Sequence, residues 1–195
     1  GQHNIVPQLL EAGRNIIVRV GRHTRGGETL QGHLERNRGQ QPEWRKERAL
    51  NKHVPRYRRR GKTEQQIQNI LRKEGDAFRK EKGSLDKAIA EGGPWDYVIL
   101  QVGKGRFDPN KYELESAVRE LVDKFRRANP DSVIILYSVW VDQENPESQA
   151  KTDAFCRKLA REHEILMAPA GTAMHPAHAD RPELSIFRSD TDSHP

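Results

Sequence analysis

The sequence is poor in cysteine, methionine and aromatic residues, and it has no long apolar run. Its 195 residues include one cysteine, two methionines and only 6% aromatic residues. A single cysteine, Cys156, excludes an internal disulfide, and no metal-ligand spacing surrounds it, so we expect a buried structural thiol. No window approaches the roughly 18 apolar residues that a membrane-spanning helix requires, so we expect no membrane span.

The N-terminus lacks an initiator methionine and the charged and apolar regions of a signal peptide. The chain opens at GQHNIVPQLL, a stretch typical of the interior of a domain. We therefore expect the native N-terminus to lie upstream. The compartment cannot be predicted from this sequence, and export in a bacterium stays open.

Charge is distributed unevenly along the chain. Residues 36–62 contain eleven Lys and Arg against two Glu, a net charge of about +9. Because the whole chain carries +6, the remainder carries about −3. The excess of positive charge thus belongs to one stretch, which we expect to be exposed because its apolar residues follow neither a helical nor a strand period. A helical part should follow, with Thr63 as its N-cap and breaks at Gly75 and Gly83.

Four segments have the composition of β-strands: residues 15–24, 96–103, 132–140 and 164–171. The last three are nearly continuous apolar runs, which suit parallel strands covered on both faces. Helical patterns fill residues 7–12, 112–129 and 146–163, the last with Ala150, Ala154, Phe155 and Leu159 on its apolar face. Alternating strands and helices predict one doubly wound α/β domain over residues 1–195, interrupted by a basic, partly helical insert at 36–92. In such folds the ligand binds at the carboxyl ends of the strands.

Five segments follow one another as in the SGNH/GDSL-type hydrolases, and the closest resemblance is to a bacterial branch of mostly unassigned function. They are RGGETLQGHLE (25–35), PWDYVILQ (94–101), ILYSVWV (135–141), LMAPAGTAM (166–174) and ELSIFRSDTDSHP (183–195). The resemblance covers about 140 of the 195 residues and omits the basic insert. It implies a flavodoxin-like α/β/α sandwich that hydrolyses carboxylic esters, often acetyl groups on carbohydrates, without a cofactor or metal.

The resemblance also implies roles for individual residues. His194 matches the general base, and Asp192 or Asp190 orients it, with Asp192 preferred because Thr191 occupies the usual acid position. The backbone N–H of Gly27 and the side chain of Gln101 match oxyanion or substrate contacts. Trp140 matches a residue that lines the pocket, although a core position suits it equally well. The usual Asn donor after Gly103 is absent.

The nucleophile of the family is not found in this sequence. No G-D-S or G-N-S tripeptide occurs, and no serine lies in a strand–turn–helix elbow. The family places that turn just ahead of a segment like HNIVPQLLEAG (3–13), so we expect the nucleophile and the first strand upstream of Gly1, and the 195 residues alone to be inactive. We also expect the sheet to have a gap between strands 15–24 and 96–103.

Two further groups of residues have weaker signals. His175, His178 and Asp180 have a spacing open to metal ligation, but Pro176 favours a surface loop. The basic insert interleaves Trp44, His53 and Tyr57 with cations, as proteins that bind nucleic acids do. A non-catalytic carbohydrate-binding or polyanion-binding descendant of the fold, including a nucleic-acid-binding one, is therefore the alternative to an esterase, although such charge runs are most often solvated surface.

Overall fold

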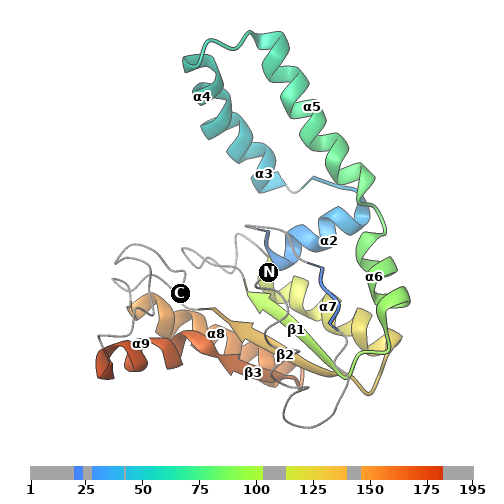
Figure 1. Ribbon diagram of the computed structural model, residues 1–195, viewed down its shortest axis with the longest axis vertical. Helices are drawn as coiled ribbons and strands as arrows, with labels where there is room; N and C mark the ends of the chain where they lie inside the picture. The colour runs from blue at the N-terminus through green and yellow to red at the C-terminus, as the bar shows by residue number, and fades with distance from the viewer. Residues whose placement is uncertain (1–19, 24–27, 42, 103–112, 140–145, 182–195) are drawn as a thin grey trace.

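The computed structural model describes residues 20–23, 28–41, 43–102, 113–139 and 146–181 (Figure 1). In this part the chain is a mixed α/β structure with an open, three-stranded sheet. The helical elements are α2 (Leu30–Arg38), α3 (Glu43–Arg48), the π-helical turn η2 (Ala49–His53), α4 (Val54–Arg59), α5 (Glu64–Lys80), α6 (Ser84–Gly92), α7 (Leu114–Ala128), α8 (Pro146–Glu162) and α9 (Ala170–Asp180). The strands are β1 (Tyr97–Val102), β2 (Val133–Ser138) and β3 (Leu166–Pro169).

The sheet is parallel, with the strand order β1-β2-β3. Three of the four predicted strands are thereby confirmed, as are the predicted helices at 112–129 and 146–163, which form the crossovers α7 and α8. At the carboxyl edge Val102 is in register with Ser138, and Ser138 with Pro169. The three strands therefore end side by side, where a parallel α/β sheet places its ligand.

Described helices pack on one face of the sheet only. Leu100 and Leu136 on that face belong to a core shared with Leu34 of α2, Val118 of α7 and Leu159 of α8. The opposite face carries exposed apolar side chains, including Tyr97 (67% exposed) and Ile99 (64%). Two layers are thus present in the described ranges, and the three-layer flavodoxin-like sandwich stays a prediction.

An asparagine of α2 caps helix α6. Asn37, near the end of α2, accepts hydrogen bonds at Oδ1 from the backbone N–H groups of Leu85 (3.0 Å) and Asp86 (3.1 Å). These N–H groups lie in the first turn of α6, where they have no intrahelical acceptor. Because Gly83 precedes this helix with φ 75° and offers no side-chain cap, Asn37 caps α6 from another element.

Helices α3, η2, α4 and α5 form an antiparallel hairpin that projects from the sheet (Figure 1). We call residues 43–80 the basic arm. Its second helix, α5, starts with the predicted N-cap: Gln66 N donates to Thr63 Oγ1, and the side chain of Gln66 accepts from Thr63 N. Val54 and Ile67 are buried within the hairpin, so a small apolar seam holds its two sides together.

The structure corrects several expectations about local structure. The first part of the insert is helical, and α5 runs through Gly75 without a break, whereas a break does occur at Gly83. The chain described at 20–23, part of the predicted strand 15–24, forms no strand, and the rest of that strand and the predicted helix 7–12 lie outside the described residues. No helix in the described ranges is long and apolar enough to cross a membrane.

Residues 175–180 form part of helix α9, so the predicted surface loop is wrong. Pro176 lies inside this helix, where its missing N–H removes one intrahelical hydrogen bond. Four alanines in residues 170–179 supply the best helix-forming residue type, which outweighs the single proline.

Candidate functional site

Most of the predicted ester-hydrolase residues lie outside the described ranges. Asp190, Asp192, His194, Gly27 and Trp140 belong to this group. Gln101 is described: it is the penultimate residue of β1, is exposed, and is in register with Tyr137 of β2. Its side chain therefore lies on the face of the sheet that carries Tyr97 and Ile99, opposite the described helices, one residue before the carboxyl edge.

A buried polar network joins the carboxyl ends of β2 and β3 to helix α8. The carboxylate of Asp153 accepts hydrogen bonds from the hydroxyls of Ser138 and Thr172 and from Gln149 Nε2, the last at 2.9 Å. Gln149 Nε2 also donates to the carbonyl of Val139 at 3.3 Å. Asp153 is 2% exposed and Ser138 is fully buried. Three donors thus satisfy a carboxylate that would otherwise be costly to bury.

The network connects two of the five segments that carry the family resemblance. Ser138 belongs to ILYSVWV (135–141), and Thr172 belongs to LMAPAGTAM (166–174). Gly171 lies so close to the side chain of Gln149 that a Cβ at this position would be 2.2 Å from it. The two segments, about 30 residues apart in the sequence, are therefore fixed together at one edge of the sheet.

The predicted apolar face of α8 is confirmed at Leu159, which is fully buried, and at Phe155, which packs against the core, but it is wrong at the two alanines. Ala150 and Ala154 are exposed, whereas the polar residues Gln149, Thr152 and Asp153 are buried together with Cys156. Their spacing of i, i+3, i+4 and i+7 was the available signal, because it is the spacing of a core-facing helix stripe. This spacing was missed because polar side chains are usually assigned to the solvent-exposed face of a helix.

Cys156 is fully buried, as expected. Burial raises the pKa of its thiol to about 11, although a hydrogen bond with Ser138 acts in the opposite direction. Since the thiolate is the reactive form, a thiol with this pKa is no nucleophile at neutral pH. Cys156 is therefore a core residue and not a catalytic one.

A second buried polar cluster lies at the start of α2, in the segment RGGETLQGHLE (25–35). Arg36 Nε donates to Glu28 Oε2 at 2.7 Å, and both side chains are nearly inaccessible. Arg45 of the basic arm reaches the other oxygen of Glu28 at 2.8 Å. Burial by itself raises the pKa of Glu28, but the hydrogen bonds from both arginines outweigh it and lower that pKa, so the carboxylate is charged at neutral pH.

Arg36 also packs on an aromatic ring of the basic arm. The guanidinium carbon of Arg36 lies 3.7 Å from the centre of the ring of Phe78 in α5. Its Nη1 is 3.2 Å from Glu81 Oε2. Thr29 caps α2 through a hydrogen bond from Gly32 N (2.9 Å), so the helix start and the ion pair are built from the same short segment.

Two histidines lie beside this cluster. The rings of His23 and His33 are 5.1 Å apart, and His23 Nε2 is 3.3 Å from Ser84 Oγ. Burial, assisted by the nearby His23 and Arg36, lowers the pKa of His33 to about 4, against opposing effects of Glu28 and Glu81. Burial also lowers the pKa of His23. Both imidazoles are therefore neutral at pH 7, and neither was singled out from the sequence.

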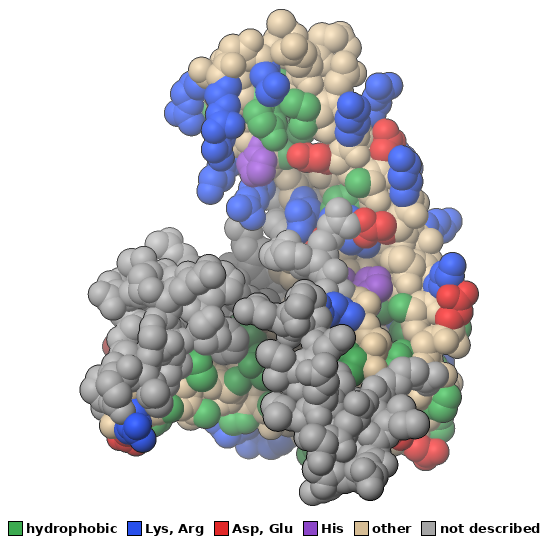
Figure 2. All heavy atoms as spheres, in the orientation of Figure 1, with side chains coloured by type: hydrophobic (Ala, Val, Ile, Leu, Met, Phe, Trp, Pro, Cys, Tyr) green, Lys and Arg blue, Asp and Glu red, His purple; other side chains and the backbone are tan. Residues whose placement is uncertain are grey.

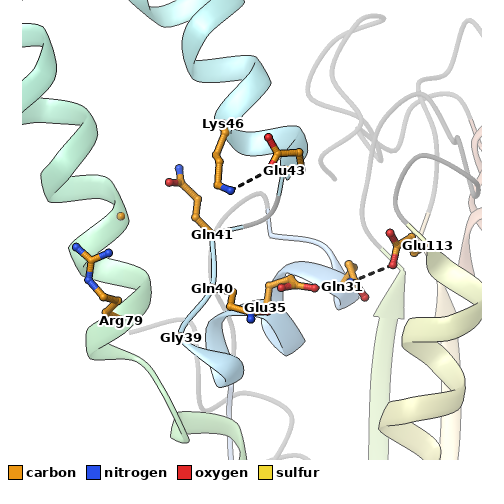
Figure 3. A pocket seen from close by; sticks show the side chains of 10 residues that line it. Gln31, Glu35, Gly39, Gln40, Gln41, Glu43, Lys46, Arg79 and Glu113 are labelled. Atoms are coloured by element: carbon orange, nitrogen blue, oxygen red, sulfur yellow. Dashed lines mark hydrogen bonds and ion pairs between the residues drawn. The ribbon is translucent and has the colours of Figure 1, made fainter.

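A polar cleft of about 620 Å³ opens between α2 and the basic arm (Figure 3). Its lining consists of amides, carboxylates, two cations and two glycines: Gln31, Glu35, Gly39, Gln40, Gln41, Glu43, Lys46, Gly75, Arg79 and Glu113. Gln31 donates to Glu113 at 3.3 Å, and Lys46 to Glu43 at 2.8 Å. Among the described residues the lining contains no serine, cysteine or histidine, so this part of the chain brings neither a nucleophile nor an imidazole for ester hydrolysis into the cleft.

Among the described residues, no group of three or more potential metal ligands comes together. The side chains of His175 and His178 lie outside the described part of the structure. Comparison of the chain with models of known protein families, with curated protein sequences and with solved structures finds no match. The resemblance to SGNH/GDSL-type hydrolases thus depends on the five segments and on the arrangement of the strands that end in them.

Proposed function

We propose that this chain belongs to an SGNH-type serine esterase that hydrolyses carboxylic esters, including acetyl groups on carbohydrates. One observation carries the proposal: Asp153 joins the end of β2 to the first turn of α9, directly after β3, and so connects two of the five resembling segments at the carboxyl edge. The end of β1 with Gln101, in a third segment, lies beside them. A parallel α/β sheet binds its substrate at this edge.

The proposed mechanism uses a serine nucleophile from an upstream strand–turn segment. Its Oγ attacks the ester carbonyl carbon, His194 takes the hydroxyl proton, and the same proton passes to the departing alcohol. Water, deprotonated by the same base, then hydrolyses the acyl-serine intermediate and releases the carboxylic acid. Asp192 or Asp190 orients the imidazole, and the Gly27 N–H and the Gln101 side chain bind the oxyanion. Trp140 lines the acyl pocket.

Hydrolysis of p-nitrophenyl acetate by the protein as its gene encodes it tests the proposal. Replacing His194 with alanine should lower kcat/KM by at least about 100-fold, because a positioned general base contributes that much or more. His163→Ala is the matched control, since His163 follows α8 on the side of β3 opposite the carboxyl edge. Activity that survives His194→Ala would remove the catalytic role from this residue.

Two additional measurements assign the remaining roles. A fluorophosphonate reagent should label one serine, which peptide mass spectrometry then locates. The proposal requires that serine to precede the segment HNIVPQLLEAG (3–13), and labelling of any other serine contradicts it. Asp192→Ala and Asp190→Ala, compared at the same pH, identify the carboxylate that orients His194 as the one whose loss reduces kcat/KM more.

A further inference from the structure

The outer surface of the basic arm carries a row of cations. Arg48, Lys52, Arg56 and Arg59 are all exposed, and we call them the basic row. Figure 2 shows Lys and Arg side chains gathered over α3 and α4, on the part of the arm that projects away from the sheet. In the part of the chain that the structure describes, none of the four has an ion-pair partner, in contrast to Arg58, which pairs with Glu64.

The row has the spacing of a single helix face. Its members are four, four and three residues apart along α3, η2 and α4, which follow one another without a break in helical structure. At a rise of about 1.5 Å per residue, the row extends for roughly 16 Å. Exposed Arg60 and Lys62 continue the positive charge to the tip of the arm.

Like charges on one helix face destabilise that helix, because each cation repels the next. A chain of anions laid along the row would remove this repulsion and release the counterions of both partners. The row therefore matches a polyanion with regularly repeated charges better than it matches a single small anion.

The chemistry of the row favours phosphates. Three of its four members are arginine, whose planar guanidinium donates two parallel hydrogen bonds to a phosphate. Two aromatic residues alternate with the cations along the sequence: His53 and Tyr57 directly follow Lys52 and Arg56, are partly exposed, and are in edge-to-face contact at 6.3 Å. Aromatic rings among arginines supply stacking surfaces for bases, which an acidic polysaccharide does not have.

The arm is fixed to the body, so the row is held in place before any partner binds. Arg45 at the base of the arm pairs with buried Glu28, and Phe78 of α5 packs under the guanidinium of Arg36. Little backbone conformational entropy is therefore lost when the arm binds a ligand. We propose that the basic row binds the phosphate backbone of a nucleic acid.

Fluorescence anisotropy with labelled 20-nucleotide duplex and single-stranded DNA tests this proposal. We expect both forms to bind with a dissociation constant in roughly the micromolar range near physiological salt, as sequence-independent phosphate contacts do. The fourfold variant Arg48→Gln, Lys52→Gln, Arg56→Gln and Arg59→Gln should bind at least tenfold more weakly. Its slope of log affinity against log salt for the duplex should fall by about 3 to 4, because four phosphate contacts are lost.

A matched variant distinguishes the row from the net charge of the chain. Arg119→Gln, Arg127→Gln, Lys151→Gln and Arg157→Gln remove three arginines and one lysine that are equally exposed on α7 and α8. This variant should bind DNA within about threefold of the unchanged protein, since nonspecific electrostatic attraction falls off within a Debye length. Equal losses in the two variants, or unchanged binding by the variant of the row, overturn the proposal.

The remaining outcomes are also decisive. Binding to heparin without binding to either DNA form would assign the row to an acidic polysaccharide and overturn the proposal. Circular dichroism should be unchanged and the unfolding midpoint should not fall in either variant, so that a loss of affinity is not a loss of fold. Ester hydrolysis has no part in these measurements, and the outcome is independent of the proposed esterase activity.

Discussion

Arg36 and Glu28 form a buried ion pair between an arginine of α2 and the residue two positions before that helix. Their side chains are 4% and 0% exposed, and the Nε–Oε2 distance is 2.7 Å. Arg45 joins the pair from the basic arm, so one carboxylate serves two guanidinium groups. The pair connects the arm to the body, and its loss should affect both.

Glu28→Gln should lower the free energy of unfolding by about 3–5 kcal/mol, because Arg36 and Arg45 then lose the charge of a fully buried carboxylate that both contact. Urea denaturation measures the effect. Glu64→Gln is the control, since it breaks the exposed pair with Arg58 and should leave the urea midpoint unchanged. Similar midpoints for the two variants would show that Glu28 is solvated.

Acid should destabilise the protein through His33. The pKa of His33 is about 4 in the folded state, below its ordinary value of 6.5. The unfolded chain therefore binds the proton first as the pH falls, so stability is complete above pH 6.5 and declines between pH 6.5 and 4. With allowance for solvent screening, we expect His33 to contribute on the order of 1–2 kcal/mol of this decline by pH 4.5.

Urea unfolding at pH 7.5, 5.5 and 4.5 measures the effect of pH on stability. His33→Gln should decline less over this interval than the unchanged protein. The neighbouring charged and titratable groups, His23, Glu28, Arg36 and Glu81, are retained in that variant. Glu28 affects stability only at still lower pH. Its folded-state pKa lies below 4.5, and the stability that its charge contributes is lost as the pH falls through that pKa. Parallel curves for the two proteins would remove His33 as the cause.

The sequence predicted the sheet well because its strands are continuous apolar runs. Residues 96–103, 132–140 and 164–171 each enclose a strand, and the amphipathic helix between the first two forms where it was expected. The period of apolar residues is a local property, and it needs no knowledge of what packs against it. Helix α9 was missed because a single proline was given more weight than its alanines.

The polar clusters could not be predicted in the same way. Asp153 and Ser138 are 15 residues apart, and Asn37 caps a helix whose first turn is 48 residues further along the chain. Such contacts depend on how elements pack, and burial converts residues of polar type into core residues. The basic insert illustrates the same limit: its charge and the helix that follows Thr63 were evident, but helices α3 and α4, with a π turn between them, were not.

Gly75→Ala should stabilise the protein by about 0.5–1 kcal/mol, because alanine favours the interior of helix α5. The nearest atom to the added Cβ would be Gln41 Oε1, at an ordinary contact distance of 3.8 Å. Gly92→Ala is the matched contrast. Its Cβ would lie 2.1 Å from Cζ2 of Trp95, so we expect a loss of about 1–3 kcal/mol. Thermal denaturation of the two variants should show midpoint shifts of opposite sign, and shifts of the same sign would contradict the packing of Trp95.

Cys156 should not react with 5,5′-dithiobis(2-nitrobenzoate) in the folded protein at pH 8. Its thiol is inaccessible, and its pKa of about 11 leaves little thiolate. In 6 M guanidinium chloride, a condition chosen to unfold the chain, one equivalent should react promptly. Rapid reaction without denaturant would mean that the core around α8 opens readily.

Ser138→Ala should destabilise the protein by about 1–3 kcal/mol, because Asp153 loses a donor in a site that water does not reach. Ser116→Ala is the control: its hydroxyl donates to the carbonyl of Glu113 in an exposed position, and a change within about 0.5 kcal/mol is expected. A double-mutant cycle with Asp153→Ala isolates the interaction of Ser138 with the carboxylate. The cycle should give a coupling energy of roughly 0.5–3 kcal/mol, as for residues in one network. Additive effects would show that Ser138 and Asp153 contribute separately, and that this hydrogen bond does not join the end of β2 to helix α8.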